Sequence, residues 1–176
     1  YRSIDFRGVM PGKRHISERP PGADNRSRVG HWEIDTVIGS HDQHCIVTLV
    51  ERKTAYTQIG KLKARTTAEL NRRVVKLLRR QPRPVRTLTA DNGTEFHQFK
   101  HIERKTGVRF FFATPHHSWE RGLNENTNGL IRQYLPKGKS MAHITQADCD
   151  AIAHRLNTRP RERLGFLTPE QCYEIR

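Results

Sequence analysis

The sequence predicts an α/β fold with a mixed sheet of five strands flanked by helices. Five short runs are apolar, either continuously or at alternate positions, as expected of strands. Three of these runs come first, and the order then continues as helix, strand, helix, strand, helix. This order is typical of an α/β protein with a mixed sheet.

The first three strands are expected near the start of the predicted domain. In 31–39, apolar side chains alternate with Glu33 and Asp35, so the strand should carry Asp35 on its less apolar face. The run over 45–51 is almost continuously apolar, as in a central strand, and 56–62 should pair with it across a short turn.

The period then changes to helical spacing. Thr66 and Glu69 match a capping box at the start of a helix that Pro82 ends. A strand over 85–90 ends at the Asp-Asn-Gly of 91–93. The other expected elements are a helix over 95–106 with Gly107 as its C′ residue, a strand over 108–114, helices over 119–134 and 145–156, and a short last helix that starts at Thr168 and Pro169.

Charge and composition narrow the class of partner. The 32 Lys and Arg against 18 Asp and Glu give a formal charge of +14, which favours a polyanionic partner such as nucleic acid. A highly soluble basic protein, such as a ribosomal accessory, remains an alternative on charge alone. Cys45, Cys149 and Cys172 are odd in number and far apart, so we predict reduced thiols rather than disulfides or a zinc site. No apolar run approaches membrane-spanning length, and no signal peptide is visible.

Two regions are predicted from composition. Residues 1–30 are basic and rich in Pro and Gly, with almost no apolar periodicity, so we expect an arm or linker. The segment also lacks the apolar residues of a helix-turn-helix, which predicts DNA binding with little sequence preference. Residues 31–176 are expected to form the core together with a C-terminal helical segment.

Acidic residues at strand ends are the main candidates for chemistry. Asp35 lies within a strand, where aspartate is disfavoured, and Asp91 follows another strand, where it is either a turn former or a ligand. Metal-dependent phosphoryl transfer needs two or three carboxylates that converge on one point. The candidates for a third carboxylate are Glu95, Glu103, Glu120 and Glu125.

Four motifs resemble one known family. "GHWEIDTVIG", "TADNGTEF", "SWERGLNENTNGLIRQYLPKG" and "LNTRPRERLGFLTPEQ" look like insertion-sequence transposases of the IS-thirty type. The resemblance runs from Gly30 to the C-terminus and implies an RNase H-like fold of the retroviral-integrase kind. Asp35, Asp91 and Glu125 match the DDE triad of this class, with 33 residues between the last two.

The resemblance also selects between the two glutamates of 118–132. The class has an Arg four positions before the catalytic Glu and a basic residue seven positions after it, and Arg121 and Arg132 fit Glu125 on both counts. Glu120 is then expected to be a helix-start carboxylate that the helix dipole favours. Ser118 stands where the wider class often has Tyr. For Trp119 beside it, core packing and a DNA contact both remain as alternatives.

The resemblance implies the catalytic domain of a DNA transposase. Two Mg²⁺ ions, replaceable by Mn²⁺, would be held by the triad for cleavage at transposon ends and transfer of the 3′-OH into target DNA. The expected partner is DNA, with the protein as a homo-oligomer on it, in the bacterial cytoplasm at the nucleoid and not in a membrane. The DNA-binding candidates are Arg121, Arg132, Trp119, Lys137 and Lys139.

Two rival functions remain open. An RNase H-like nuclease would cut without joining, and the motif "LNTRPRERLGFLTPEQ" argues against it. A DNA-binding protein with a vestigial site is the other, and the intact triad argues against it. The arginines of the helix after 66, Arg72, Arg73, Arg79 and Arg80, are either a solvated face or part of a phosphate-tracking surface.

Overall fold

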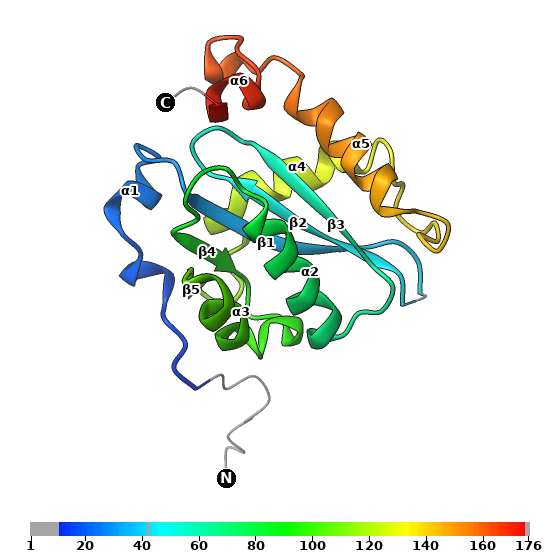
Figure 1. The fold of residues 1–176 in the computed structure, drawn as a ribbon, viewed down its shortest axis with the longest axis horizontal. Helices are drawn as coiled ribbons and strands as arrows, with labels where there is room; N and C mark the ends of the chain where they lie inside the picture. The colour runs from blue at the N-terminus through cyan, green and yellow to red at the C-terminus, as the bar shows by residue number, and fades with distance from the viewer. Residues whose placement is uncertain (1–10, 42, 175–176) are drawn as a thin grey trace.

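The computed structural model describes residues 11–41 and 43–174, which fold around one five-stranded sheet (Figure 1). The strands are β1 (His31–Ile38), β2 (Cys45–Glu51), β3 (Thr57–Leu62), β4 (Thr87–Ala90) and β5 (Arg109–Phe112). Their order is β3-β2-β1-β4-β5. The β1–β2 and β2–β3 pairs are antiparallel, and the β1–β4 and β4–β5 pairs are parallel. The predicted mixed sheet of five strands is therefore confirmed.

Helices cover both faces of the sheet. The α-helices are α1 (Pro21–Asp24), α2 (Thr67–Arg79), α3 (Phe99–Thr106), α4 (Gly122–Ile131), α5 (Gln146–Asn157) and α6 (Pro169–Glu174). The 3₁₀ turns are η1 (Ile16–Glu18), η2 (Thr94–Phe96), η3 (Ser118–Arg121) and η4 (Glu162–Leu164). Helices α2 and α3 pack on one face, and α4 and α5 pack on the other (Figure 1). None of the helices in these described ranges is long and apolar enough to span a membrane.

The alternation along β1 separates two hydrophobic cores. Trp32 and Ile34 are buried in the core under α2 and α3, whereas Val37 belongs to the core under α4 and α5. Since side chains alternate along a strand, Glu33 and Asp35 share the α4 side with Val37. This arrangement confirms that Asp35 lies on the less apolar face of its strand.

Helix starts follow the predicted signals in part. Thr66 is the N-cap of α2, and its hydroxyl accepts the backbone N–H of Glu69 at 3.2 Å. The carboxylate of Glu69 accepts the backbone N–H of Lys63 rather than that of Thr66, so only half of the expected capping box forms. Two predicted helices are also divided: 95–106 becomes η2 and α3, and 119–134 becomes η3 and α4.

The predicted arm is ordered where the structure describes it. Its first ten residues lie outside the described range, but η1 and α1 form within 11–30 and pack against the core. The carbonyl of Arg14 accepts the N–H of Phe112 at 2.9 Å, and the Arg19 guanidinium donates to the Thr89 hydroxyl at 3.1 Å. Ordered structure therefore starts upstream of β1, while the boundary between arm and core domain stays a prediction.

The three cysteines are free thiols, as predicted. Burial raises the pKa of Cys45 to about 11 and that of Cys149 to about 12. Because the thiolate is the reactive form, both side chains act as small apolar groups of the core.

Candidate active site

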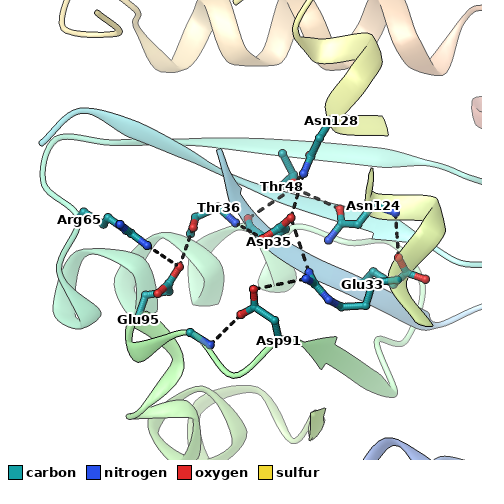
Figure 2. Close-up of polar contacts among 11 residues, drawn as sticks. Glu33, Asp35, Thr36, Thr48, Arg65, Asp91, Glu95, Asn124 and Asn128 are labelled. Carbon is teal, nitrogen blue, oxygen red and sulfur yellow. Dashed lines mark hydrogen bonds and ion pairs between the residues drawn. The ribbon is translucent and has the colours of Figure 1, made fainter. Parts of the chain in front are cut away.

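The site starts from Asp35 in the central strand of the sheet. Its side chain is 21% exposed, and one oxygen, Oδ2, accepts a hydrogen bond from Asn128 Nδ2 at 2.9 Å (Figure 2). The other oxygen accepts the backbone N–H of Thr36 at 2.9 Å. Burial raises the pKa of Asp35, a nearby Arg121 opposes this shift, and Asp91 adds to it.

Asp91 follows β4, which runs parallel to β1. Because Glu33 of β1 lies opposite Thr89 of β4, the register places Asp91 beside Asp35. Its Oδ1 accepts the backbone N–H of Gly93 at 2.8 Å, so the residue is a turn former and also faces the site. A Cβ at Gly93 would lie 2.6 Å from Glu95 Oε2 and 2.9 Å from Asp91 Oδ1. A larger residue at this turn would therefore push the Glu95 and Asp91 carboxylates out of their present positions.

One guanidinium joins the two aspartates. Arg121 NH1 lies 3.6 Å from Asp35 Oδ2, and Arg121 NH2 lies 3.3 Å from Asp91 Oδ2. Its side chain is only 13% exposed, and two buried nitrogens, Nε and NH1, have no hydrogen-bond partner in the described part of the chain. The two carboxylates thus share a cation, held by charge more than by hydrogen bonds.

Glu125 lies in the first turn of α4, with its side chain exposed. It precedes Asn128 by three residues, which places the two on neighbouring positions of one helix face. Within 11–41 and 43–174, no three His, Cys, Asp or Glu side chains gather closely enough to hold a metal ion. The structure thus brings together Asp35 and Asp91, and the role of Glu125 as third ligand stays a prediction.

The inner face of α4 is more polar than its sequence suggests. Leu123 and Ile131 are buried, and Asn124 is fully buried as well. The hydroxyl of Thr48 in β2 donates toward the carboxamide oxygens of Asn124 and Asn128, each at 3.3 Å (Figure 2). Sequence reasoning missed Thr48 and Asn124, because long-range pairing between an amide and a hydroxyl leaves no periodic signal.

Glu95, one of the four candidate third carboxylates, has other partners. Its Oε1 accepts the Thr36 hydroxyl at 2.7 Å and lies 3.4 Å from Arg65 NH2 (Figure 2). Burial alone would raise the pKa of Glu95, but the hydrogen bonds and Arg65 bring it below its ordinary value. Glu95 therefore braces β1 next to Asp35.

Glu120 holds the loop that leads into α4. Its carboxylate accepts the backbone N–H of Thr114 at 2.7 Å and the hydroxyl of the same residue at 3.0 Å. His117 Nδ1 lies 3.5 Å away. Glu120 is in η3, the turn that leads directly into α4, and its hydrogen bonds connect this turn to Thr114; an interaction with the dipole of α4 stays a prediction.

The remaining residues predicted to contact DNA differ in whether their side chains are bonded within the protein. Arg132 donates to the carbonyl of Ile38 at 2.8 Å, which ties the end of α4 to β1. Lys137 and Lys139 are exposed in the loop after α4. This loop lies at the end of β1, because the N–H of Gly138 donates to the carbonyl of Gly39 at 3.0 Å.

Trp119 is an exposed aromatic side chain near the site. It is 68% exposed and stacks on His117 with ring centroids 4.3 Å apart. The alternative of core packing is therefore excluded for this residue. Beside it is a pocket of about 430 Å³ whose lining includes Asp91, His116 and Arg121.

A second concavity lies between α2 and α3. It measures about 600 Å³, and its lining includes no Asp or Glu among the described residues. Its cationic side chains are Arg72, Lys76, Arg79, Arg80 and Lys105. Arg73 turns away and donates to the carbonyl of Lys61 at 3.0 Å. We call this concavity the α2–α3 groove.

Comparison with known sequences gives consistent matches. The transposase for insertion sequence element IS4351 of Bacteroides fragilis is 44% identical over 168 residues, covering 96% of this chain and 52% of that protein. Transposase InsI for IS30A of Escherichia coli (strain K12) is 42% identical over 160 residues, covering 90% and 42%. The chain is a homologue of insertion-sequence transposases. This homology confirms the resemblance seen in the motifs, although the chain spans only about half the length of these relatives, and no family model matches it.

Solved structures with a similar fold are catalytic domains of retroviral integrases. The catalytic core domain of BIV integrase superposes with a TM-score of 0.61 at 19% identity, covering 82% of this chain and 93% of that one. A chain of the simian T-cell lymphotropic virus intasome, in complex with PP2A regulatory subunit B56 gamma, gives 0.68 at 16% identity, covering 83% and 54%. The sheet and its flanking helices therefore have the RNase H-like fold of integrase catalytic cores.

Proposed function

We propose that this chain is the catalytic core of a transposase that cleaves DNA at the ends of its element and joins the resulting 3′-OH to target DNA. The observation that carries the proposal is the pair of aspartates, Asp35 in β1 and Asp91 just after the parallel strand β4, which both face the Arg121 guanidinium beside α4. Homology to insertion-sequence transposases supports the same reaction.

The carboxylate oxygens of Asp35 and Asp91 suit Mg²⁺ or Mn²⁺. Asp35 and Asp91 already direct oxygens at one positive charge, and carboxylates are the ligands that hard divalent cations prefer. We propose that Asp35 and Asp91, together with Glu125 from α4, would hold the two ions. Bound there, the ions would activate the attacking oxygen and stabilise the leaving oxygen of an in-line displacement.

The chain itself contributes positioning and charge. Asn128 orients Asp35 by donating to Oδ2, and Gly93 orients Asp91 by donating to Oδ1. Metal held by both aspartates would take over the neutralising role of Arg121, whose guanidinium would then be available for a DNA phosphate next to them. No covalent protein–DNA intermediate is needed, so no serine or tyrosine nucleophile is assigned.

DNA is the proposed partner, with the protein acting as a homo-oligomer at the bacterial nucleoid. Lys137 and Lys139 extend from the loop at the end of β1, and Trp119 offers an exposed ring for stacking on a base. Arg132 is proposed to act at the DNA only through the placement of α4, because its guanidinium is bonded to a carbonyl.

The deciding experiment incubates the chain with labelled duplex that carries an element end, with and without Mn²⁺, and separates nicked from joined products. Metal-dependent nicking and joining are expected. Nicking without joining would instead indicate a nuclease, and binding without either product would indicate a vestigial site.

Charge reversal in the α2–α3 groove should weaken DNA binding. Lys76→Glu together with Arg80→Glu removes two cations that line it. Because each phosphate contact releases counterions, the log–log salt slope should shrink by about 0.9 per lost contact. Fluorescence anisotropy with a random duplex at several salt concentrations measures this slope.

The matched control is Lys100→Glu together with Arg104→Glu. Both residues are exposed in α3 but do not line the groove, and the pair changes net charge equally. If the control shrinks the slope as much as the groove variant does, the effect is one of overall charge and the groove is not a DNA contact.

A further inference from the structure

Glu33 is a fully buried carboxylate that the proposed metal site does not use. It lies in β1 two residues before Asp35, on the same face of the strand, and its side chain is 0% exposed. A carboxylate in such a place is costly unless it is paired and hydrogen-bonded. Its partners therefore indicate what it is for.

The first partner is Arg52, which follows β2 and is almost completely buried. Its NH1 forms an ion pair with Glu33 Oε1. Its Nε donates to the carbonyl of Ala23 in α1 at 2.8 Å, so the ordered part of the arm holds the guanidinium from the other side. The pair thus has little freedom to move.

The second partner is the start of α4. Glu33 Oε2 accepts the backbone N–H of Asn124 at 2.8 Å (Figure 2). Asn124 is the third residue of α4, and the first four N–H groups of a helix have no partner within it. No side chain caps this helix at its N-cap position, Arg121. Glu33 therefore supplies, from a neighbouring strand, the acceptor and the negative charge that a local cap would provide.

Glu125 is the next residue after Asn124. The other ties to the sheet are weaker or further along: Thr48 reaches two α4 carboxamides at 3.3 Å, and Asn128 reaches Asp35 at 2.9 Å. Of the two contacts at Asn124, the residue before Glu125, the bond from Glu33 is the shorter one, carries a charge and reaches the helix backbone. It fixes the first turn of the helix against the strand that carries Asp35.

We propose that Glu33, held by Arg52, is a positioning residue that sets the first turn of α4 and thereby the place of Glu125 relative to Asp35. The inference rests on the proposed role of Glu125 as a metal ligand. Glu33 acts through the helix and does not itself touch metal or DNA. A purely stabilising role is the alternative, and it makes different predictions.

The test replaces both charges at once, with Glu33→Leu and Arg52→Met in one variant. Removal of a buried pair by apolar residues is tolerated better than removal of one partner, so the double variant should fold. Hydrogen exchange at the amides of 122–125 should accelerate at least tenfold, because the Asn124 N–H loses its acceptor. The Kd of Mn²⁺, obtained from the increase in the free energy of unfolding with Mn²⁺ concentration, should rise about 10- to 100-fold, as for loss of a group that orients a metal ligand. Glu33→Gln keeps one acceptor oxygen and should give intermediate values in both measurements.

Glu51→Gln is the matched control. Glu51 is also fully buried, but its carboxylate accepts from Gly30 and from Lys53 and Thr54 in the turn after β2. It should lower the melting temperature without changing exchange at 122–125 or the Kd of Mn²⁺. Unchanged exchange and an unchanged Kd in the folded double variant would overturn the proposal, as would equal changes in the control. If wild type shows no Mn²⁺ response, the proposed metal site fails, whereas the exchange measurement still tests the placement of α4.

Discussion

Glu125→Gln is expected to reduce metal-dependent nicking and joining by more than about 100-fold while the protein stays folded. Loss of a group that merely orients a metal ligand costs up to about 100-fold, so loss of a charged ligand should cost more. The side chain is exposed, and glutamine has almost the same volume. The melting temperature without metal should therefore be unchanged. Nicking of labelled duplex with Mg²⁺ and with Mn²⁺ measures the first effect, and thermal unfolding without metal measures the second.

Glu120→Gln is the control, and it should behave in the opposite way. Its carboxylate accepts two hydrogen bonds from Thr114, and an amide can accept only one of them. About 1 kcal/mol of stability should be lost, which lowers the melting temperature by roughly 2–4 °C for a domain of this size. Activity at a permissive temperature should be largely retained. If Glu120→Gln abolishes nicking while Glu125→Gln spares it, the third carboxylate has been assigned to the wrong residue.

The sequence predicted those parts of the fold that have local causes. Alternation along β1 placed Asp35 on the less apolar face of the strand, and the parallel pairing of β1 with β4 explains why Asp91 lies beside it. Helix signals at Thr66 and Gly107 also match observed caps, and the helix expected from 145 begins there, with Thr145 as its N-cap. Each of these signals depends on neighbours within four residues or on a period of two or 3.6, which a single sequence displays.

The other parts depend on contacts between distant residues. The arm is held partly by hydrogen bonds to distant residues, such as that from Arg19 to Thr89. Such contacts leave no apolar period in the sequence, so the order of the arm was not predicted. Glu33 reads as an ordinary polar position of a strand until the fold brings Asn124 to it, 91 residues away along the chain. The position of Arg121 between two aspartates could likewise not be inferred. The resemblance to the transposase class implied that this arginine contacts DNA instead.

Arg121→Met is expected to lower the melting temperature of the metal-free protein and to raise its affinity for Mn²⁺. The guanidinium now neutralises Asp35 and Asp91, so its removal leaves two carboxylates facing each other and should lower the melting temperature. A cation that enters wild type must first displace this positive charge. At about 4 Å, one unit charge contributes about 1 to 4 kcal/mol between the dielectric constants of water and of a protein surface. Affinity for Mn²⁺ should thus rise at least about tenfold in the variant, which equals about 1.4 kcal/mol.

Thermal unfolding over a series of Mn²⁺ concentrations, in the absence of DNA, measures both effects, because a ligand that binds only the folded state raises stability by RT ln(1 + [L]/Kd). Arg132→Met provides the comparison, since that guanidinium donates to the carbonyl of Ile38 and the structure gives it no carboxylate partner among the described residues. It should lower the melting temperature at every Mn²⁺ concentration by a similar amount. A Kd of Mn²⁺ that is the same in Arg121→Met and wild type would contradict competition between arginine and metal, because the two would then occupy different places. A Kd that rises in Arg121→Met would mean that the guanidinium helps to form the metal site, and Arg121 would then act with the ions rather than in their place.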